Sequence, residues 1–120
     1  MTRAIVLLGH GSRDPAWREP MDAVAARVRE RAPGLPVACA FLEWQAPDLD
    51  AAIDALAAQG ATSVVVLPMF VGVGKHVRDD LPRRLAAARE RHPALAIRAL
   101  ASVGEQATAL DCMASIALEA

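Results

Sequence analysis

Hydrophobic positions along the chain form short continuous runs, separated by segments in which they recur at helical spacing. The runs predict strands buried on both faces, because parallel strands covered by helices lack polar alternation. Four such runs lie at residues 4–8 (AIVLL), 36–43 (PVACAFLE), 63–70 (SVVVLPMF) and 95–101 (LAIRALA). Pro68 has no N–H to donate within a sheet, so regular pairing of the third strand should end near it.

Between the runs, apolar residues recur every three or four positions, as on one face of a helix. Asp14-Pro15 and Pro47-Asp48 suit the starts of two helices, which should end at Pro33-Gly34 and Gly60. A third helix is predicted from about residue 79 to residue 92, and a fourth over residues 104–119. The apolar faces of the four helices are formed by Trp17, Met21, Val24 and Val28; Leu49, Ile53 and Leu56; Leu81, Leu85 and Ala88; and Leu110, Met113 and Ala117.

Strand and helix therefore alternate strictly along the whole chain. Such alternation predicts an α/β fold, with a four-stranded parallel sheet flanked by helices and joined by right-handed crossovers. We expect the strand order 2-1-3-4. The chain has 120 residues and no linker or low-complexity tract, so one domain over residues 1–120 is expected.

Composition and charge exclude several classes of partner. A formal net charge of -1 provides no overall basic field for nucleic acid. No apolar run approaches the roughly 18 residues of a membrane span, and the run at residues 4–8 is too short for a secretory signal. Cys39 and Cys112 stand far apart and outside any CxxC motif, which predicts reduced thiols and a cytoplasmic location.

Unusual polar residues follow three of the predicted strands. His10 comes after the first strand, Glu43 ends the second and His76 comes after the third. In parallel α/β sheets, ligands bind beyond the carboxyl ends of the strands. Imidazoles and a carboxylate are suitable ligands for first-row divalent metals and accept protons near neutral pH. These three residues are therefore candidate catalytic residues and metal ligands, although solvated loop side chains are the alternative interpretation.

The same loops carry cations that could bind an anionic ligand. The candidates for carboxylate binding are Arg13, Lys75 and Arg78. Gly72 and Gly74 should make the loop after the third predicted strand flexible. His92 is different, because it falls in the last turn of the predicted third helix, where an imidazolium suits the helix dipole. We assign His92 no chemistry.

Other ligand-binding motifs fail on spacing. Gly9-His10-Gly11 begins like G-x-G-x-x-G, but Asp14 stands at the third glycine position. Ser12 does not lie in G-x-S-x-G, and neither a P-loop pattern nor a CxxC zinc site is present.

Three segments carry a resemblance to a known family. LLGHGSRD, AFLEWQAPDLDAAI and PMFVGVGKHVRDDLP resemble the sirohydrochlorin chelatases of the small CbiX type. The resemblance covers about the first 85 residues closely and the rest by architecture. Its most specific part is the pattern P-x-F-x-x-x-G-x-H-x-x-x-D-x-P, which is met by Pro68, Phe70, Gly74, His76, Asp80 and Pro82.

This resemblance implies a chelatase-like lobe that inserts a divalent metal into a sirohydrochlorin-like tetrapyrrole, for cobalamin or sirohaem-type biosynthesis. The metal is a co-substrate, with cobalt the first expectation and iron or nickel the others, and no organic cofactor is implied. His10 and His76 would be the metal-handling histidines, with Glu43 beside them. Two such lobes would pair as a homodimer.

Two other functions stay open from the residues alone. A non-catalytic metal- or tetrapyrrole-binding protein could use the same ligands. A phosphate-binding α/β domain could use the loop at residues 9–12.

Overall fold

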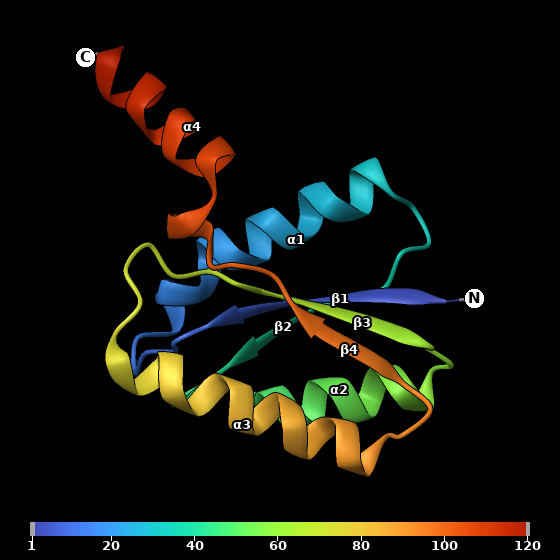
Figure 1. Ribbon diagram of the computed structural model, residues 1–120. Coiled ribbons are helices and arrows are strands. Elements are labelled where there is room, and N and C mark those ends of the chain that lie inside the picture. Colours follow the sequence, from blue (N-terminus) through green and yellow to red (C-terminus); the bar gives the residue numbers. More distant parts are fainter. Residues whose placement is uncertain (1, 120) are drawn as a thin grey trace.

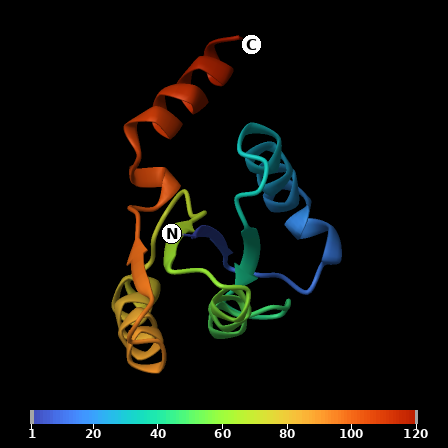
Figure 2. The ribbon, with the colours of Figure 1, turned by 90° about the vertical axis from the view of Figure 1, so that its right-hand side faces the viewer.

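The computed structural model describes residues 2–119 and places helices on both faces of one sheet (Figure 1, Figure 2). The sheet consists of β1 (Arg3–Gly9), β2 (Val37–Phe41), β3 (Ser63–Pro68) and β4 (Ala96–Ala99). All neighbours are parallel, and their order is β2-β1-β3-β4. The predicted α/β class and strand order are confirmed. β3 ends at Pro68, as its missing N–H predicts.

The helical elements alternate with the strands. They are η1 (Pro15–Arg18), α1 (Glu19–Arg31), α2 (Leu49–Ala58), α3 (Lys75–Arg91), η2 (Val103–Glu105) and α4 (Ala107–Leu118). α2 and α3 cover one face of the sheet and α1 lies on the other (Figure 1). Within residues 2–119, no helix combines the length and apolar character needed to cross a bilayer.

The apolar core consists of one cluster on each face of the sheet. Val6, Leu8 and Val66 are fully buried on the face that α2 and α3 cover. Leu7 and Phe41 are buried on the opposite face, with Met21 of α1. Strand residues that point to either face of the sheet are therefore buried, which explains why the strands appear in the sequence as continuous apolar runs.

The first predicted helix is divided into two elements. Asp14 caps the start as predicted, since its Oδ1 accepts a hydrogen bond from the Ala16 amide at 2.9 Å. However, the chain forms the 3₁₀ turn η1 first, and α1 then begins with Pro20 in its first turn. Pro20 lacks the N–H that would bond to the Ala16 carbonyl, and the Glu19 amide donates to that carbonyl instead, which closes the 3₁₀ turn.

The third predicted helix begins earlier than expected. We expected a start near residue 79, but α3 begins at Lys75 and includes His76 and Arg78 in its first turns. Gly74 is its N-cap, without a side-chain hydrogen bond, and no acidic residue lies in the first turn. The usual sequence signals of a helix start are absent here, which explains the error. Pro82 lies inside this helix.

The last helix forms, but its apolar face is not packed. No residue of α4 is buried, and Leu110, Met113 and Ile116 are 47%, 38% and 61% exposed. α4 points away from the rest of the molecule (Figure 1).

Candidate functional site

His10 and Glu43 are brought together by the carboxyl ends of β1 and β2. The backbone ladder continues past both strands, because the Leu42 amide donates to the Gly9 carbonyl and the Glu43 amide to the His10 carbonyl, each at 3.0 Å. His10 Nε2 lies 2.8 Å from Glu43 Oε1, and the two side chains are 53% and 51% exposed. Glu43 was predicted as the end of a strand, but it lies two residues beyond Phe41, where β2 ends. The pair is formed and still accessible to a ligand.

Gly11 allows these two loops to approach so closely. Its φ is +98°, and a Cβ atom there would lie 1.7 Å from the Glu43 carbonyl oxygen. An L side chain is disfavoured by that dihedral and has no room beside that oxygen. A glycine is therefore required next to His10 for structural reasons.

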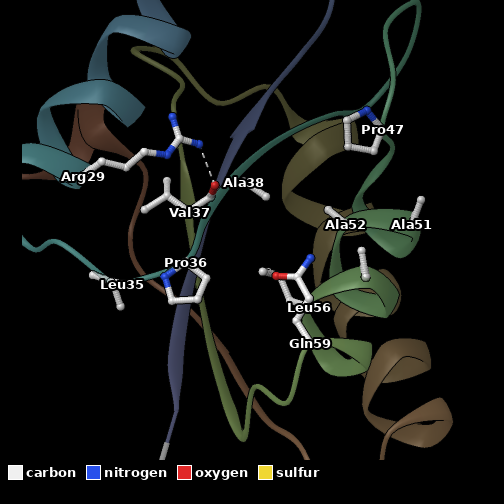
Figure 3. Close-up of a pocket in the computed structure, with 12 residues that line it drawn as sticks. Arg29, Leu35, Pro36, Val37, Ala38, Pro47, Ala51, Ala52, Leu56 and Gln59 are labelled. Carbon is white, nitrogen blue, oxygen red and sulfur yellow. Dashed lines mark hydrogen bonds between the residues drawn. The ribbon is translucent and has the colours of Figure 1, made fainter.

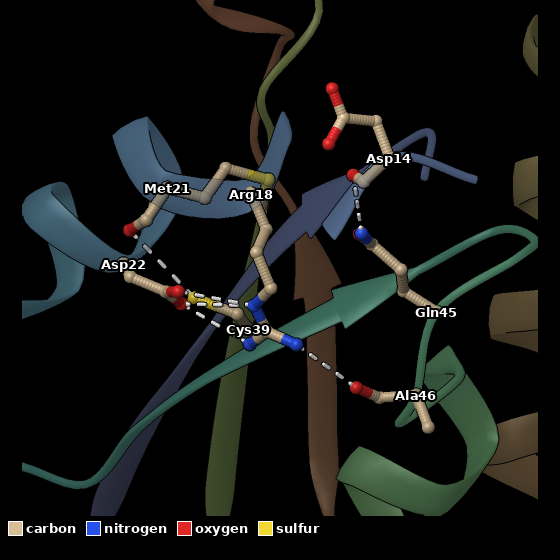
Figure 4. A network of polar contacts seen from close by, with 7 residues as sticks. All are labelled: Asp14, Arg18, Met21, Asp22, Cys39, Gln45 and Ala46. Atoms are coloured by element: carbon tan, nitrogen blue, oxygen red, sulfur yellow. Dashed lines mark hydrogen bonds and ion pairs between the residues drawn. The ribbon is translucent and has the colours of Figure 1, made fainter. Parts of the chain in front are cut away.

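A network of polar contacts holds the same two loops from outside (Figure 4). Gln45 Nε2 donates to the Asp14 carbonyl at 3.1 Å, and Arg18 Nη1 donates to the Ala46 carbonyl at 3.2 Å. Hydrogen bonding to Asp22 holds the pKa of Arg18 above its ordinary value. Arg18 thus connects η1 to the loop after β2. Gln45 connects that loop to the loop after β1.

Cys39 lies beside this network but has no place in a metal site. Its Sγ is 3.8 Å from the Met21 carbonyl oxygen, to which it donates. Burial raises the pKa of the Cys39 thiol, so the thiolate that binds metals is disfavoured. Cys39 therefore acts as a packing residue.

α3 supplies the opposite wall of the site. A cavity of about 130 Å³ is lined by His10, Leu42, Glu43, His76, Val77, Asp80, Leu81 and Arg84. The three residues singled out in the sequence thus line one cavity at the carboxyl edge of the sheet. No three His, Cys, Asp or Glu side chains among residues 2–119 lie close enough together to hold one ion. Among the three, His10 and Glu43 form a direct contact, and His76 lies on the facing wall.

Asp80 and Arg84 also line this cavity, although no sequence pattern assigned them a role. Arg84 Nε donates to Asp80 Oδ2 at 2.6 Å. That hydrogen bond lowers the pKa of Asp80, and the charges of Arg84 and His76 add to the effect. Residues 76, 80 and 84 follow the i, i+4 spacing of one helix face. The spacing was visible in the sequence, but a helix start placed near residue 79 excluded His76 from it.

The three candidate carboxylate-binding cations are distributed differently. Arg78 lines a second cavity of about 350 Å³, which shares Val77 and Leu81 with the smaller one. The Arg13 guanidinium lies 4.1 Å from the ring centroid of Trp44. Lys75 is exposed at the first turn of α3. Of these three cations, Arg78 is the one that lines either of the two cavities at this edge.

His92 lies at the other end of α3. Its Nε2 is 2.6 Å from Asp54 Oδ1, and this contact together with a hydrogen bond from Arg91 lowers the pKa of Asp54. His92 thus makes a local contact with a carboxylate, at the opposite end of α3 from the cavity.

A larger cavity at the outer edge of β2 does not have the features of a reactive site (Figure 3). It measures about 510 Å³, and alanines, prolines and other apolar groups form most of its wall. Its only ionisable lining residue is Arg29, whose Nη2 already donates to the Val37 carbonyl at 2.9 Å. The clustered imidazole and carboxylate groups favour the cavity at the carboxyl edge instead.

The sequence matches the CbiX family model over residues 4–120. It is 35% identical over 89 residues to the sirohydrochlorin cobaltochelatase of Methanocaldococcus jannaschii, covering 74% of this chain and 62% of that protein. It is 37% identical over 81 residues to the protein of the same name from Methanothermobacter thermautotrophicus, covering 68% of this chain and 56% of that protein. The match thus spans less than two thirds of these relatives.

Solved structures show the same fold. The putative cobalamin biosynthesis CbiX protein of Marinobacter aquaeolei superimposes with a TM-score of 0.85 at 27% identity, covering 98% of this chain and 95% of that one. The sirohydrochlorin chelatase SirB of Bacillus subtilis subspecies spizizenii, in complex with cobalt, superimposes with a TM-score of 0.71 at 30% identity. The match covers 88% of this chain and 45% of that one. This chain therefore corresponds to slightly less than half of SirB.

Proposed function

We propose that this chain, which belongs to the CbiX family, is a chelatase that inserts a divalent metal into sirohydrochlorin or a closely related tetrapyrrole. The observation that carries the proposal is the His10–Glu43 pair, with Nε2 and Oε1 2.8 Å apart, facing His76 across one cavity. The names of the relatives, sirohydrochlorin cobaltochelatase and sirohydrochlorin chelatase, support the reaction class.

Metal insertion requires two changes at once. The metal must lose bound water, and two pyrrole nitrogens must lose their protons. When His10 Nε2 donates to Glu43, the ring's Nδ1 keeps a lone pair that can bind a metal or accept a proton. A metal that is a substrate must also leave, so few protein ligands and several open positions suit this site. We assign metal handling and proton acceptance to His10, Glu43 and His76.

The macrocycle is proposed to lie across the open edge beside α3. Sirohydrochlorin is a flat apolar ring with carboxylates at its rim. The cavity of about 350 Å³ beside the metal-handling residues has mostly apolar walls and includes Arg78. Arg78 is therefore the first candidate for a substrate carboxylate. Arg13, which stacks on Trp44, and the exposed Lys75 are candidates for carboxylates farther out.

We also propose that residues 1–120 form one domain that works as a homodimer. The cavity between His10 and His76 measures only about 130 Å³ and opens to solvent, so one lobe encloses little of a macrocycle. A second lobe would supply the other wall and exclude water. The unpaired thiols of Cys39 and Cys112 support a reducing, cytoplasmic location.

Cobalt is the proposed physiological metal, because the relatives above are named cobaltochelatases. Imidazole and carboxylate ligands bind Fe²⁺ and Ni²⁺ as well. The product would then be a cobalt or iron tetrapyrrole on the way to cobalamin or sirohaem.

The test is an insertion assay with purified protein, sirohydrochlorin and Co²⁺, Fe²⁺ or Ni²⁺ in turn. Absorbance follows the product, and the rate without protein is the reference. We expect a rate that rises in proportion to protein concentration. Binding of metal or tetrapyrrole with no rate above the reference would instead favour a non-catalytic binding protein. Binding of nucleotide without any effect of metal would favour the phosphate-binding alternative.

A further inference from the structure

The small cavity at the carboxyl edge of the sheet has four potential metal donors in its wall, but they do not form one site. His10, Glu43, His76 and Asp80 all line this cavity of about 130 Å³. Nevertheless, no three His, Cys, Asp or Glu side chains within residues 2–119 are close enough to share an ion. His10 and Glu43 contact each other, whereas Asp80 is held by a cation.

Arg84 is the cation that holds Asp80. Its Nε donates to Asp80 Oδ2 at 2.6 Å, and the Arg84 and Asp80 side chains are 38% and 28% exposed. Partial burial makes such a pair stronger than one that is fully in water. Within α3, Arg84 lies one turn after Asp80, and His76 lies one turn before it. The contact therefore joins Asp80 to the turn that leads away from His76.

His76 and Asp80 have the spacing of two ligands for one ion. Side chains four residues apart on a helix lie on the same face, and pairs at this spacing bind a single metal in the H-E-x-x-H motif. Among the histidines of residues 2–119, His10 and His92 form side-chain hydrogen bonds and His76 does not. His76 is thus open to a ligand, and Asp80 would be the neighbouring oxygen donor if Arg84 released it.

A further carboxylate ligand would change how tightly the metal is held. The carboxylates in the cavity wall are those of Glu43 and Asp80, and Arg84 is the one lysine or arginine among the described residues that line it. Metal affinity rises with the number of charged oxygen ligands. A metal that is a substrate must leave the protein for the tetrapyrrole, so a site with an additional carboxylate would trap it.

We propose that Arg84 is a positioning residue that keeps Asp80 out of the ligand shell of the metal, so that the metal stays weakly bound and passes to the macrocycle. His10, Glu43 and His76 handle the metal, while the Asp80 carboxylate stays paired with Arg84. The inference rests on the metal-handling roles proposed above and gives a cause for weak binding. Its main readout is metal affinity without tetrapyrrole, which is measured separately from insertion.

The first experiment measures the affinity of the full chain for Co²⁺ by titration calorimetry, with no tetrapyrrole present. Arg84→Gln frees Asp80 and should lower the Kd for Co²⁺ at least about tenfold. Arg83→Gln is the matched control, because the exposed Arg83 carries the same charge on the neighbouring residue but donates to the Asp79 carbonyl. It should change the Kd less than about threefold. Circular dichroism confirms that both variants are folded.

Two further variants show whether Asp80 is the added ligand. The double variant Asp80→Asn with Arg84→Gln replaces the freed carboxylate by a neutral amide, so its Kd for Co²⁺ should return to within about threefold of the wild type. Arg84→Lys keeps a cation and a hydrogen-bond donor for Asp80. Its Kd should also stay within about threefold of the wild type, which provides a second test that does not require the loss of the pair.

Insertion kinetics separate positioning from a merely structural role. Arg84→Gln should lower both the KM for Co²⁺ and kcat, because a metal held more tightly leaves more slowly. A general loss of structure would not tighten binding.

Three results would overturn the inference: an Arg84→Gln Kd no lower than that of the wild type, equal tightening by Arg83→Gln, or tightening that persists in the double variant. Each of them leaves the chelatase proposal standing. Conversely, the expected Kd changes without insertion by the wild type would support the role of Arg84 and overturn the chelatase proposal.

Discussion

Single residues decide whether the site has reactive groups in reach of one another. His10 and Glu43 belong to different strand ends, and the ladder that continues past β1 and β2 aligns them. His76 approaches the same cavity from α3. Because these groups are exposed, their substitution should affect chemistry far more than stability.

We expect His10→Ala and His76→Ala each to lower the rate of metal insertion about 10²–10⁴-fold, the usual cost of losing a proton acceptor. The effects should not add, since the residues act on one step. The measurement is the insertion rate above the uncatalysed reference. His92→Ala is the control, because His92 pairs with Asp54 at the far end of α3. It should lose about 1 kcal/mol of stability at most and no activity. The reverse pattern would place the site elsewhere.

Two glycines with nearly the same positive φ separate dihedral strain from steric conflict. Gly60 has a φ of +97° and free space around a Cβ, whereas Gly11, at +98°, faces the Glu43 carbonyl oxygen. Gly60→Ala should cost about 1–2 kcal/mol in the free energy of unfolding. The loss in the free energy of unfolding for Gly11→Ala should exceed about 4 kcal/mol, because the backbone must move. Urea unfolding measures both. Equal losses would show that the close approach at Gly11 can relax.

At the scale of elements, strands were predicted better than helix starts. The strand runs were correct to within two residues at every end, because burial on both faces leaves a direct pattern in the sequence. α3 was misplaced by four residues at its start, since Gly74 offers no capping side chain. That error concealed the face on which His76, Asp80 and Arg84 lie one turn apart. A helix start without a cap is fixed by packing against the rest of the fold, which a local pattern does not record.

The Asp80–Arg84 contact on α3 makes stability depend on pH. The folded protein lowers the pKa of Asp80 through the Arg84 hydrogen bond, so its stabilisation is complete above the unfolded pKa of about 3.9 and is lost as the pH falls further. Melting temperatures of the wild type and Arg84→Gln should therefore differ near neutral pH and converge in acid. Arg83→Gln is the control, because the Arg83 side chain donates to the Asp79 carbonyl and its charge has the smallest effect on the pKa of Asp80, so its melting temperature should differ much less from the wild type. A wild-type advantage that persisted in strong acid would contradict this account.

At the scale of the whole molecule, the chain has one complete face and one incomplete face. An open groove of about 190 Å³, with Ile5, Val65 and Leu67 in its wall, lies on the face that carries α1, and no residue of α4 is buried. Burial of each large apolar side chain contributes about 1.5–3 kcal/mol. A single lobe therefore lacks stabilisation that a pair of lobes would gain.

We accordingly expect the melting temperature of the wild type to rise with protein concentration, as mass action requires of a folded dimer. Met113→Glu places a carboxylate among the exposed apolar side chains of α4, so it should shift the rise to higher protein concentrations. Ser115→Glu, on the polar side of the same helix, should leave the rise where it is in the wild type. Calorimetry over a wide range of concentrations provides the measurement. A melting temperature that is independent of concentration in the wild type would show that one lobe is stable without a partner.

The sequence by itself determined the class of fold and the edge at which the candidate site residues lie, and the expected strand order 2-1-3-4 is confirmed. The class of fold and the edge follow from local burial patterns and from the rule that parallel strands end at one edge, so no contact between distant segments was needed. The tertiary structure decided the direct pairing of His10 with Glu43, the wall formed by Asp80 and Arg84, and the outward direction of α4. Each depends on atoms from segments far apart in the chain meeting at distances of a few ångströms, and one-dimensional spacing does not encode such meetings.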